Sequence, residues 1–463
     1  MSDDRRPNIL YIMSDDHAAH AMTCYGSVIN RTPQMDRIAA EGMRLDNCFC
    51  TNSICTPSRA SILTGKYSHL NGVPTLREAM DQRQMTAPKL LQAAGYETGI
   101  FGKWHLGHGG IHDPRGFDRW CVLPGQGLYH DPKMFDQGEE RVFEGYATDI
   151  ITDMSLDWLQ RRDADRPFFL MTHHKAPHRP WEPDDRHADM YEEIDIPEPA
   201  NLFDDYSHRG TAAREAKMRI GRDFNERDLK VEPPAGLSEE EFVRWSYQRY
   251  IKDYLRCVAS VDDNIGRMLD WLDDAGLAED TVVIYTSDQG FFLGDHGWYD
   301  KRFMYEESLR MPFVVRYPRE IAAGAVNNDL ILNIDFPALF LDYAGLDTPR
   351  QMQGVSFRDN LRGETPGDWR ESLYYRYSMH IDGGHSVWAH YGLRTARYKL
   401  IFYYEEEPGP QEWELFDLQQ DPMEMHSVYG DPAYAGVIAD LKEELARLRS
   451  EVGDQENPWP EDL

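Results

Sequence analysis

Acidic and amide side chains follow two apolar runs that are typical of buried strands. Asp15 and Asp16 come directly after "NILYIMS", and Asp288 and Gln289 come directly after "TVVIYTS". Adjacent acids at a strand end are usually a turn or a helix cap, and for Asp288 taken alone a turn is an equally good interpretation. Together, three carboxylates and one amide oxygen suit a hard cation such as Ca²⁺ or Mg²⁺ rather than zinc, which favours histidine and thiolate.

Cationic side chains follow other strand-like runs. Lys103, Trp104 and His105 come after "TGIFG", His178 lies in "HHKAPHRPW" after "PFFLMT", and Lys301 lies in "GDHGWYDKRFMYEES". A lone lysine or histidine in a loop is more often a surface or packing residue than a ligand. Two cations beside a tryptophan and between glycines nevertheless indicate an anion-binding corner.

Cys55 stands at the start of a short helical pattern in "TNSICTPSRASILTGKY". Thr56 is suited to cap that helix and Pro57 to its first position, which places Cys55 at the positive end with Arg59 one turn inside. That field would stabilise a thiolate or any oxyanion placed there. A cysteine phosphatase loop needs five residues between cysteine and arginine, whereas three stand here and one is proline. A cysteine protease would need a defined histidine and acid partner, which the pattern does not supply.

Strand-like runs alternate with helical patterns, so the fold class is predicted to be α/β with a large, mostly parallel sheet between helices. "TPQMDRIAAEG" has Thr32 as a helix cap, and a long helix opens with a capping box at Ser238 and extends to about Gly276. Asp262 in that helix is expected on a solvated face. Ligands of such sheets bind outside the carboxyl ends of the strands, so the polar clusters are expected to converge at one edge.

Two units are predicted, a catalytic domain over residues 1–365 and a C-terminal subdomain over 366–463. The boundary follows "GETPGDW", after which short strand-like runs and a terminal helix predict a small antiparallel sheet plus helix. Residues 182–237 are charged and weakly periodic, which is typical of a lid or specificity insertion.

The chain has 463 residues, with 49 basic and 80 acidic side chains and a formal net charge of −31. Such a surface argues against nucleic-acid and membrane-surface partners, and an anionic substrate would need a local cationic pocket. No signal-like or membrane-length apolar run occurs, and the six cysteines form no CxxC pair, so a cytoplasmic location is expected. Nothing in the composition indicates an oligomeric state.

At "CTPSRASILTG" the sequence resembles the type I sulfatases, whose signature is Cys-x-Pro-Ser-Arg followed by Leu-Thr-Gly. The resemblance extends through "NILYIMSDD", "GYETGIFGKWHLG", "KAPHRPW", "YTSDQGFFLGDHGWYDKRFMYEES" and the C-terminal "YGLRTARYKL". It therefore spans nearly the whole chain. It implies an alkaline-phosphatase-like fold and hydrolysis of a sulfate monoester.

The resemblance also implies a cofactor and a partner for Cys55. A formylglycine-generating enzyme would oxidise the cysteine to formylglycine, whose hydrated aldehyde attacks sulfur through one hydroxyl and eliminates sulfate through the other. The residues that match the family's site are Asp15, Asp16, Asp288, Gln289 and residue 55 for the metal, Arg59 and Lys103 for the diol, His105 as the base for elimination, and Lys103, His178 and Lys301 for the sulfate and the leaving oxygen.

Gln289 bears on the choice between branches of this superfamily, because related phosphonate monoester and phosphodiester hydrolases have histidine there. A neutral amide oxygen favours Ca²⁺ over Mg²⁺ or Mn²⁺ and favours the sulfatase branch. The phosphonate monoester or phosphodiester hydrolase stays the alternative.

The segments around Lys301 and 374–400 are most similar to bacterial carbohydrate sulfatases resembling N-acetylglucosamine-6-sulfatase. A small or terminal monosulfate ester of a sugar, or an aryl or alkyl sulfate, is the expected substrate. Trp104 is a candidate stacking face together with Trp181, Trp298 and Tyr299, although buried aromatics are commoner. Of His380, His385 and His390 in the C-terminal unit, at least one contact with the substrate is expected, and His385 is the candidate.

Overall fold

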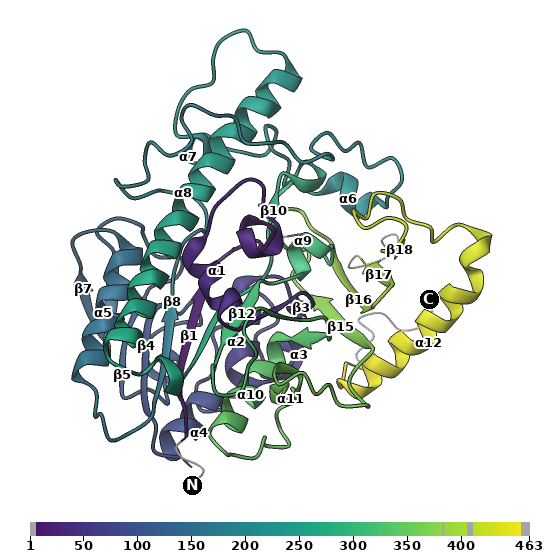
Figure 1. Ribbon diagram of the computed structural model, residues 1–463. Helices are drawn as coiled ribbons and strands as arrows, with labels where there is room; N and C mark the ends of the chain where they lie inside the picture. Colours follow the sequence, from purple (N-terminus) through teal and green to yellow (C-terminus); the bar gives the residue numbers. More distant parts are fainter. Residues whose placement is uncertain (1–5, 382–383, 405–410, 455–463) are drawn as a thin grey trace.

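The computed structural model describes residues 6–381, 384–404 and 411–454. A ten-stranded sheet forms its centre, in the order β13-β2-β12-β9-β1-β8-β4-β5-β6-β7 (Figure 1). The strands are β1 Asn8–Ser14, β2 Met43–Leu45, β4 Glu97–Lys103, β5 Arg119–Leu123, β6 Lys133–Asp136, β7 Glu139–Val142, β8 Phe168–His173, β9 Thr281–Ser287, β12 Phe313–Arg316 and β13 Ala325–Asn327.

The middle of this sheet is parallel. β9, β1, β8, β4 and β5 run in one direction, and β12 and β6 flank them in antiparallel pairing. The central strands β1, β8 and β9 are buried and rich in aliphatic and aromatic residues, as expected of strands covered on both faces. Their carboxyl ends therefore meet at one edge.

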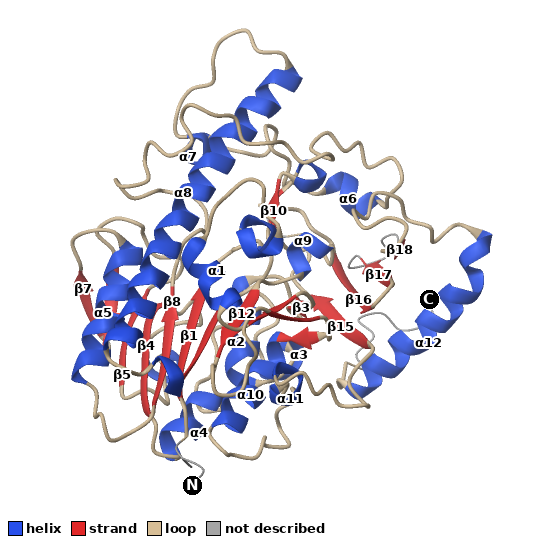
Figure 2. Ribbon diagram, viewed as in Figure 1, coloured by secondary structure: helices blue, strands red, loops and turns tan. Residues whose placement is uncertain are grey.

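Helices cover both faces of the sheet (Figure 2). Phe168 and Phe169 are neighbours on β8 and point to opposite faces, because side chains alternate along a strand. Phe168 packs against Trp158 of α5, whereas Phe169 packs against Phe340 of α10. The helices are α1 Pro33–Ala40, α2 Cys55–Thr64, α3 Ser68–Asn71, α4 Ala87–Ala93, α5 Ala147–Arg161, α6 Thr211–Glu215, α7 Glu226–Leu229, α8 Glu239–Asp274, α9 Glu306–Leu309, α10 Phe336–Tyr343, α11 Arg358–Leu361 and α12 Ala435–Glu451.

The long helix α8 begins at the predicted capping box, in which Ser238 and Glu241 satisfy each other's backbone N–H groups. The expectation for Asp262 is wrong. This side chain is only 3% exposed, and its carboxylate accepts hydrogen bonds from the backbone N–H groups of Gln34 and Met35 at 2.9–3.2 Å. Because α8 packs across the first turn of α1, Asp262 supplies the acceptor that the free N–H groups of α1 require.

A second, four-stranded antiparallel sheet lies in the C-terminal part, in the order β15-β16-β17-β18, with α12 against β15 and β16 (Figure 1). Its strands are β15 Ser372–Tyr377, β16 Ala389–Thr395, β17 Tyr398–Tyr404 and β18 Glu412–Asp417. The short strands β3 Cys48–Phe49 and β14 Ile331–Leu332 pair with each other, as do β10 Phe292–Leu293 and β11 Tyr299–Asp300. The predicted fold class, a large mostly parallel sheet plus a smaller antiparallel sheet with a helix, is confirmed.

The segment 182–237 is mostly loop, with the short helices α6 and α7. It contacts the C-terminal part, since the N–H of Lys217 donates to the carbonyl of His385 and the N–H of Gly210 donates to Glu414. Its function as a lid stays a prediction. Across the described part of the chain, no helix combines the length and the apolar character needed to cross a membrane.

Candidate active site

Four of the parallel strands end level with one another. Ser14 of β1 pairs in register with Ser287 of β9, and His173 of β8 pairs with Gly102 of β4. The residues that follow these strands therefore emerge at the same edge of the sheet. The structure brings together there the carboxylates, the amide and the cations that the sequence places after strand ends.

The three acidic residues form the centre of the site. Asp15, Asp16 and Asp288 are fully buried, and one oxygen from each lies within 4.8 Å of the others. Burial, together with the other two carboxylates, raises the pKa of Asp16 to about 8, although Lys301 opposes the shift. Burial and Asp15 likewise raise the pKa of Asp288. Such crowding of negative charge is relieved by a cation bound among the oxygens.

Three cationic side chains surround these acids. Lys301 Nζ lies 2.6 Å and 2.7 Å from the two carboxylate oxygens of Asp16. Arg59 donates from Nε to Asp288 at 2.9 Å and from Nη2 to Asp15 at 3.1 Å. Lys103 also pairs with Asp15.

These cations act against burial at Asp15. Burial disfavours the Asp15 carboxylate, but Lys103, His178 and Arg59 hold its pKa well below the usual range.

Gln289 supplies the observation that tests whether a metal fits. Its amide nitrogen donates to Asp16 at 2.5 Å, whereas its Oε1 is buried and has no hydrogen-bond partner. Buried carbonyl oxygens are nearly always paired, so an unpaired one beside three carboxylates is a free ligand position. These residues fit a hard divalent cation.

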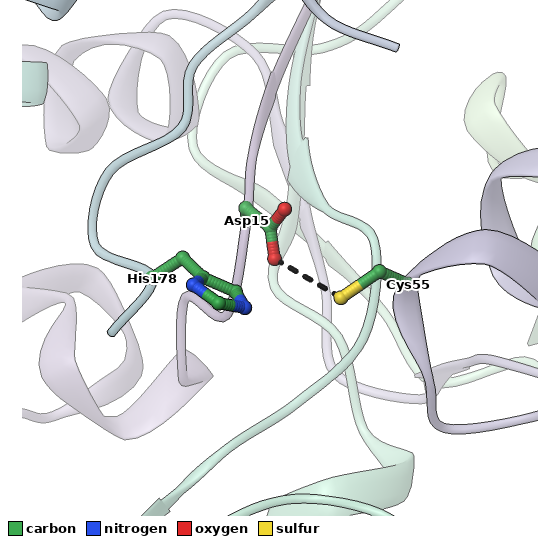
Figure 3. A group of neighbouring side chains, drawn as sticks. All are labelled: Asp15, Cys55 and His178. Atoms are coloured by element: carbon green, nitrogen blue, oxygen red, sulfur yellow. Dashed lines mark hydrogen bonds between the residues drawn. The ribbon is translucent and has the colours of Figure 1, made fainter. Parts of the chain in front are cut away.

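Cys55 faces the same acids from the first residue of α2. The helix begins two residues earlier than predicted, with Ile54 rather than Thr56 at the cap position, because the carbonyl of Ile54 already accepts from the N–H of Ser58. Cys55 is 1% exposed, and its Sγ lies 3.4 Å from Oδ1 of Asp15 (Figure 3). Burial, reinforced by Asp15, raises the pKa of this thiol well above its usual value. Burial therefore outweighs the field of the helix start at this thiol.

The two predicted catalytic histidines are both near the acids or their cations. His178 Nδ1 lies 2.7 Å from the carbonyl of Arg179, and its Nε2 lies 3.7 Å from Asp16. The ring faces Asp15 and Cys55 (Figure 3). Burial and the charge of Lys103 hold the pKa of His178 well below its usual range. Burial, Lys103 and Arg59 also lower the pKa of His105, which is half-buried after β4.

Two further predicted contacts have different outcomes. Trp104 is 2% exposed, donates from its indole to the carbonyl of His112 and packs edge-on against Phe117. It is thus a packing residue in this structure, and no stacking face is left on its surface. His385 lies at the edge of the site, with Nε2 3.2 Å from Asp300, the neighbour of Lys301.

Most of the remaining aromatic and histidine candidates are interior residues, whereas His380 is half-buried and accepts from the N–H of Ala389. Trp181, Trp298 and Tyr299 are buried, and His390 is stacked between Tyr375 and Tyr377 in the C-terminal sheet. His390 does not reach the site, because strand alternation directs it into the core rather than toward the catalytic edge.

Sequence reasoning missed Gln126. Its Oε1 accepts a hydrogen bond from Lys103 Nζ at 2.5 Å. Gln126 lies in "PGQG", which directly follows "RWCVL", another short apolar run. The strand-end pattern that found the other residues would have found this one.

Comparison with known proteins agrees with this geometry. The family model described as sulfatase matches residues 7–346. The chain belongs to the sulfatase family. A second model, described as N-sulphoglucosamine sulphohydrolase, C-terminal, matches residues 294–451 of this sulfatase.

Individual relatives give the same result. An N-acetylglucosamine-6-O-sulfatase of Bacteroides thetaiotaomicron is 43% identical over 502 aligned positions, which cover 98% of this chain and 88% of the relative. A solved structure of a protein in complex with its substrate D-glucosamine-2-N,6-O-disulfate has a TM-score of 0.95 and 43% identity, with 99% of this chain and 100% of the other covered. The phosphonate monoester hydrolase of Agrobacterium radiobacter, at 21% identity, TM-score 0.76 and 96% coverage of both chains, shares the fold. This sulfatase is a sulfuric ester hydrolase.

Proposed function

We propose that this sulfatase removes sulfate from a sulfated amino sugar of the glucosamine 6-sulfate kind, using a formylglycine made from Cys55. The observation that carries the proposal is the convergence of Cys55, three carboxylates and three cations at one edge of the sheet. The substrate class is supported by the relatives at 43% identity, one named for N-acetylglucosamine 6-O-sulfate and one bound to a glucosamine disulfate.

A divalent cation, with Ca²⁺ preferred over Mg²⁺ or Mn²⁺, is proposed to be held by Asp15, Asp16, Asp288, Gln289 and residue 55. When bound, it would act as a Lewis acid toward the nucleophile and the sulfate. The preference for Ca²⁺ follows from the ligand set, because the free Oε1 of Gln289 adds a neutral oxygen to three carboxylates. Asp15, Cys55 and His178 form a second possible ligand group, which would suit a softer metal. Oxidation of Cys55 to formylglycine removes the thiol from that group.

The catalytic roles follow from where each side chain points. Arg59 and Lys103, held by Asp15 and Asp288, are placed to orient the hydrated aldehyde at residue 55. The formylglycine, once formed and hydrated, would supply one hydroxyl as nucleophile toward sulfur and a second whose deprotonation allows sulfate to leave. His105 is proposed to accept the proton of that second hydroxyl.

His178 and Lys301 are proposed to meet the sulfate and the leaving oxygen, and Lys103 is proposed to meet the sulfate as well. The Arg179 carbonyl accepts from Nδ1 of His178, so that Nε2 faces the site and can deliver a proton to the departing alcohol. The negative charge of a bound sulfate favours the protonated imidazole that this step needs.

The proposed partner, a formylglycine-generating enzyme, would have to act before the chain folds. Every residue of α2 is buried, including Cys55 and Arg59, so the Cys-x-Pro-x-Arg motif is inaccessible in the folded protein.

The location is proposed to be a reducing, cytoplasmic one, since all six cysteines are free thiols. His385, beside Asp300, is the proposed sugar contact from the C-terminal part.

The test is hydrolysis of glucosamine 6-sulfate by protein whose Thr51–Arg59 peptide shows the mass change from cysteine to formylglycine. The converted enzyme should release sulfate, and Cys55→Ala should not. An aryl sulfate and an aryl phosphodiester are run in parallel with Ca²⁺ and with Mn²⁺. If the phosphodiester with Mn²⁺ is the faster reaction, the phosphonate monoester or phosphodiester hydrolase alternative is correct instead.

A further inference from the structure

Gln126 lies at the same sheet edge as the catalytic side chains. Its strand, β5, runs parallel to β4, and Leu123 pairs in register with Lys103. Gln126 follows Leu123 by three residues, just as the acids follow β1 and β9 and His178 follows β8. It therefore extends the site to the next strand of the parallel core.

A tight turn fixes Gln126 in this place. Gly127 donates from its N–H to the carbonyl of Pro124 at 2.9 Å, and Gly125 and Gly127 have φ values of 50° and 69°. A Cβ on Gly127 would come 2.9 Å from the Leu123 side chain, so a larger residue would force this turn to shift. The turn thus holds Gln126 at its tip, between two residues in left-handed conformation.

The two ends of the Gln126 amide have different surroundings. Oε1 accepts from the buried Lys103 Nζ, which itself pairs with Asp15. The amide nitrogen makes no hydrogen bond to any residue that the structure describes, and the side chain is only half-buried. Because Oε1 is committed to Lys103, the two N–H groups are directed away from that lysine and are free to donate.

We infer that Gln126 is a substrate-contacting residue that donates an amide N–H to an oxygen of the sulfate ester while its carbonyl holds Lys103. A sulfate ester offers only acceptors, so a neutral amide N–H beside a lysine suits it, and a carboxylate at this position would repel it. The inference rests on the proposed role of Lys103 in binding sulfate. It assigns to β5 a part in recognition that the other site residues do not cover.

The experiment compares Gln126→Met, Gln126→Glu and the wild type, all with formylglycine formed and Ca²⁺ present. kcat and KM are measured on the sulfate ester, together with the inhibition constant of inorganic sulfate. Gln126→Met should raise KM and the sulfate inhibition constant by about 10-fold each, the typical effect of losing one hydrogen bond to a charged group, with a smaller change in kcat. Gln126→Glu should raise both by about 100-fold, because it replaces a donor with a negative charge.

Gln160→Glu is the matched control, since Gln160 is exposed near the end of α5 and the substitution adds the same charge away from the strand ends. It should leave both constants unchanged. Thermal unfolding midpoints check that each variant is folded. If Gln126→Met leaves both constants at the wild-type value, the inference is overturned.

Two further outcomes separate the alternatives. A loss in kcat with an unchanged inhibition constant would also overturn the inference, because Gln126 would then act only through Lys103. If the converted wild type neither cleaves the ester nor binds sulfate, the proposed function itself is wrong, whatever the Gln126 variants do.

Discussion

Two clusters of buried charge in this protein are alike in composition and differ in position. The strand-end cluster contains Asp15, Asp16, Asp288, Arg59, Lys103 and Lys301. The α9 cluster contains Glu306 at the start of α9, Arg394 of β16, Lys399 of β17 and Glu424. In each cluster the carboxylates and the cations are equal in number, so charge balance does not distinguish the two.

Geometry separates the two clusters. In the α9 cluster, Arg394 and Lys399 come from within strands, and Lys399 Nζ lies 3.0 Å and 2.6 Å from Glu306 and Glu424. In the strand-end cluster, the acids directly follow β1 and β9, Lys103 is the last residue of β4 and Lys301 follows β11. Arg59 lies one turn inside α2. Gln289 adds an oxygen with no hydrogen-bond partner. Charges that pair with one another within a sheet and its neighbours are typical of a structural ion-pair network, whereas paired charge at strand ends with a free ligand oxygen indicates a catalytic centre.

Removal of the nucleophile is the strongest test of the assignment of the strand-end cluster as the catalytic centre. Cys55→Ala should lower turnover of a sulfate ester by at least about 10⁴-fold, since no covalent route remains. Its unfolding midpoint should change little, because the thiol contributes no strong bond. Cys24→Ala, at a half-buried cysteine outside the site, should keep full activity, and equal activity of the two variants would contradict the assignment.

Metal removal should affect only the strand-end cluster. Treatment with a chelator should lower turnover by about 1000-fold, because Lewis-acid stabilisation is worth several kcal/mol, and added Ca²⁺ should restore it. Activity and unfolding midpoint are followed in the same samples. A chelated protein with full activity would show that the free oxygen of Gln289 is not a metal ligand.

Substitution of Lys399 tests the α9 cluster. Lys399→Met should cost about 3–5 kcal/mol of unfolding free energy, since it leaves two buried carboxylates with fewer partners. KM should be unchanged in protein that is still folded, which urea titration and kinetics together would show. Lys133→Met, at an exposed ion pair, is the control and should cost less than about 1 kcal/mol. A raised KM for Lys399→Met would instead connect this cluster to the substrate.

The smallest predicted effect is the pH dependence of stability that comes from Glu424. Burial raises the pKa of Glu424 to about 7, against the opposing charge of Lys399. The folded state therefore keeps a proton that the unfolded state loses near pH 4.5, so this residue lowers stability as pH rises from about 4.5 to 7. Glu424→Gln should flatten that part of the stability profile, as measured by urea unfolding at a series of pH values. An unchanged slope would mean that Glu424 is ionised in the folded protein.

Local patterns in the sequence were reliable where the cause is local. The capping box at Ser238 and the helix after Thr32 depend on neighbouring residues, and both helices form where predicted. The sequence also predicted the polar residues at the ends of β1, β4, β8 and β9, because each comes where an apolar run gives way to polar residues.

The sequence by itself determined the chemistry, because the acids, the cations and the Cys-x-Pro-Ser-Arg segment stand in the chain next to the strands and helix that carry them. The tertiary structure decided which of these groups meet. The order β1-β8-β4-β5 brings Gln126 to Lys103, and the packing of α8 on α1 buries Asp262. Burial beside Asp15 raises the pKa of the Cys55 thiol despite its place at a helix start. Each of these outcomes depends on residues far apart in the chain, and no local period or cap encodes such contacts.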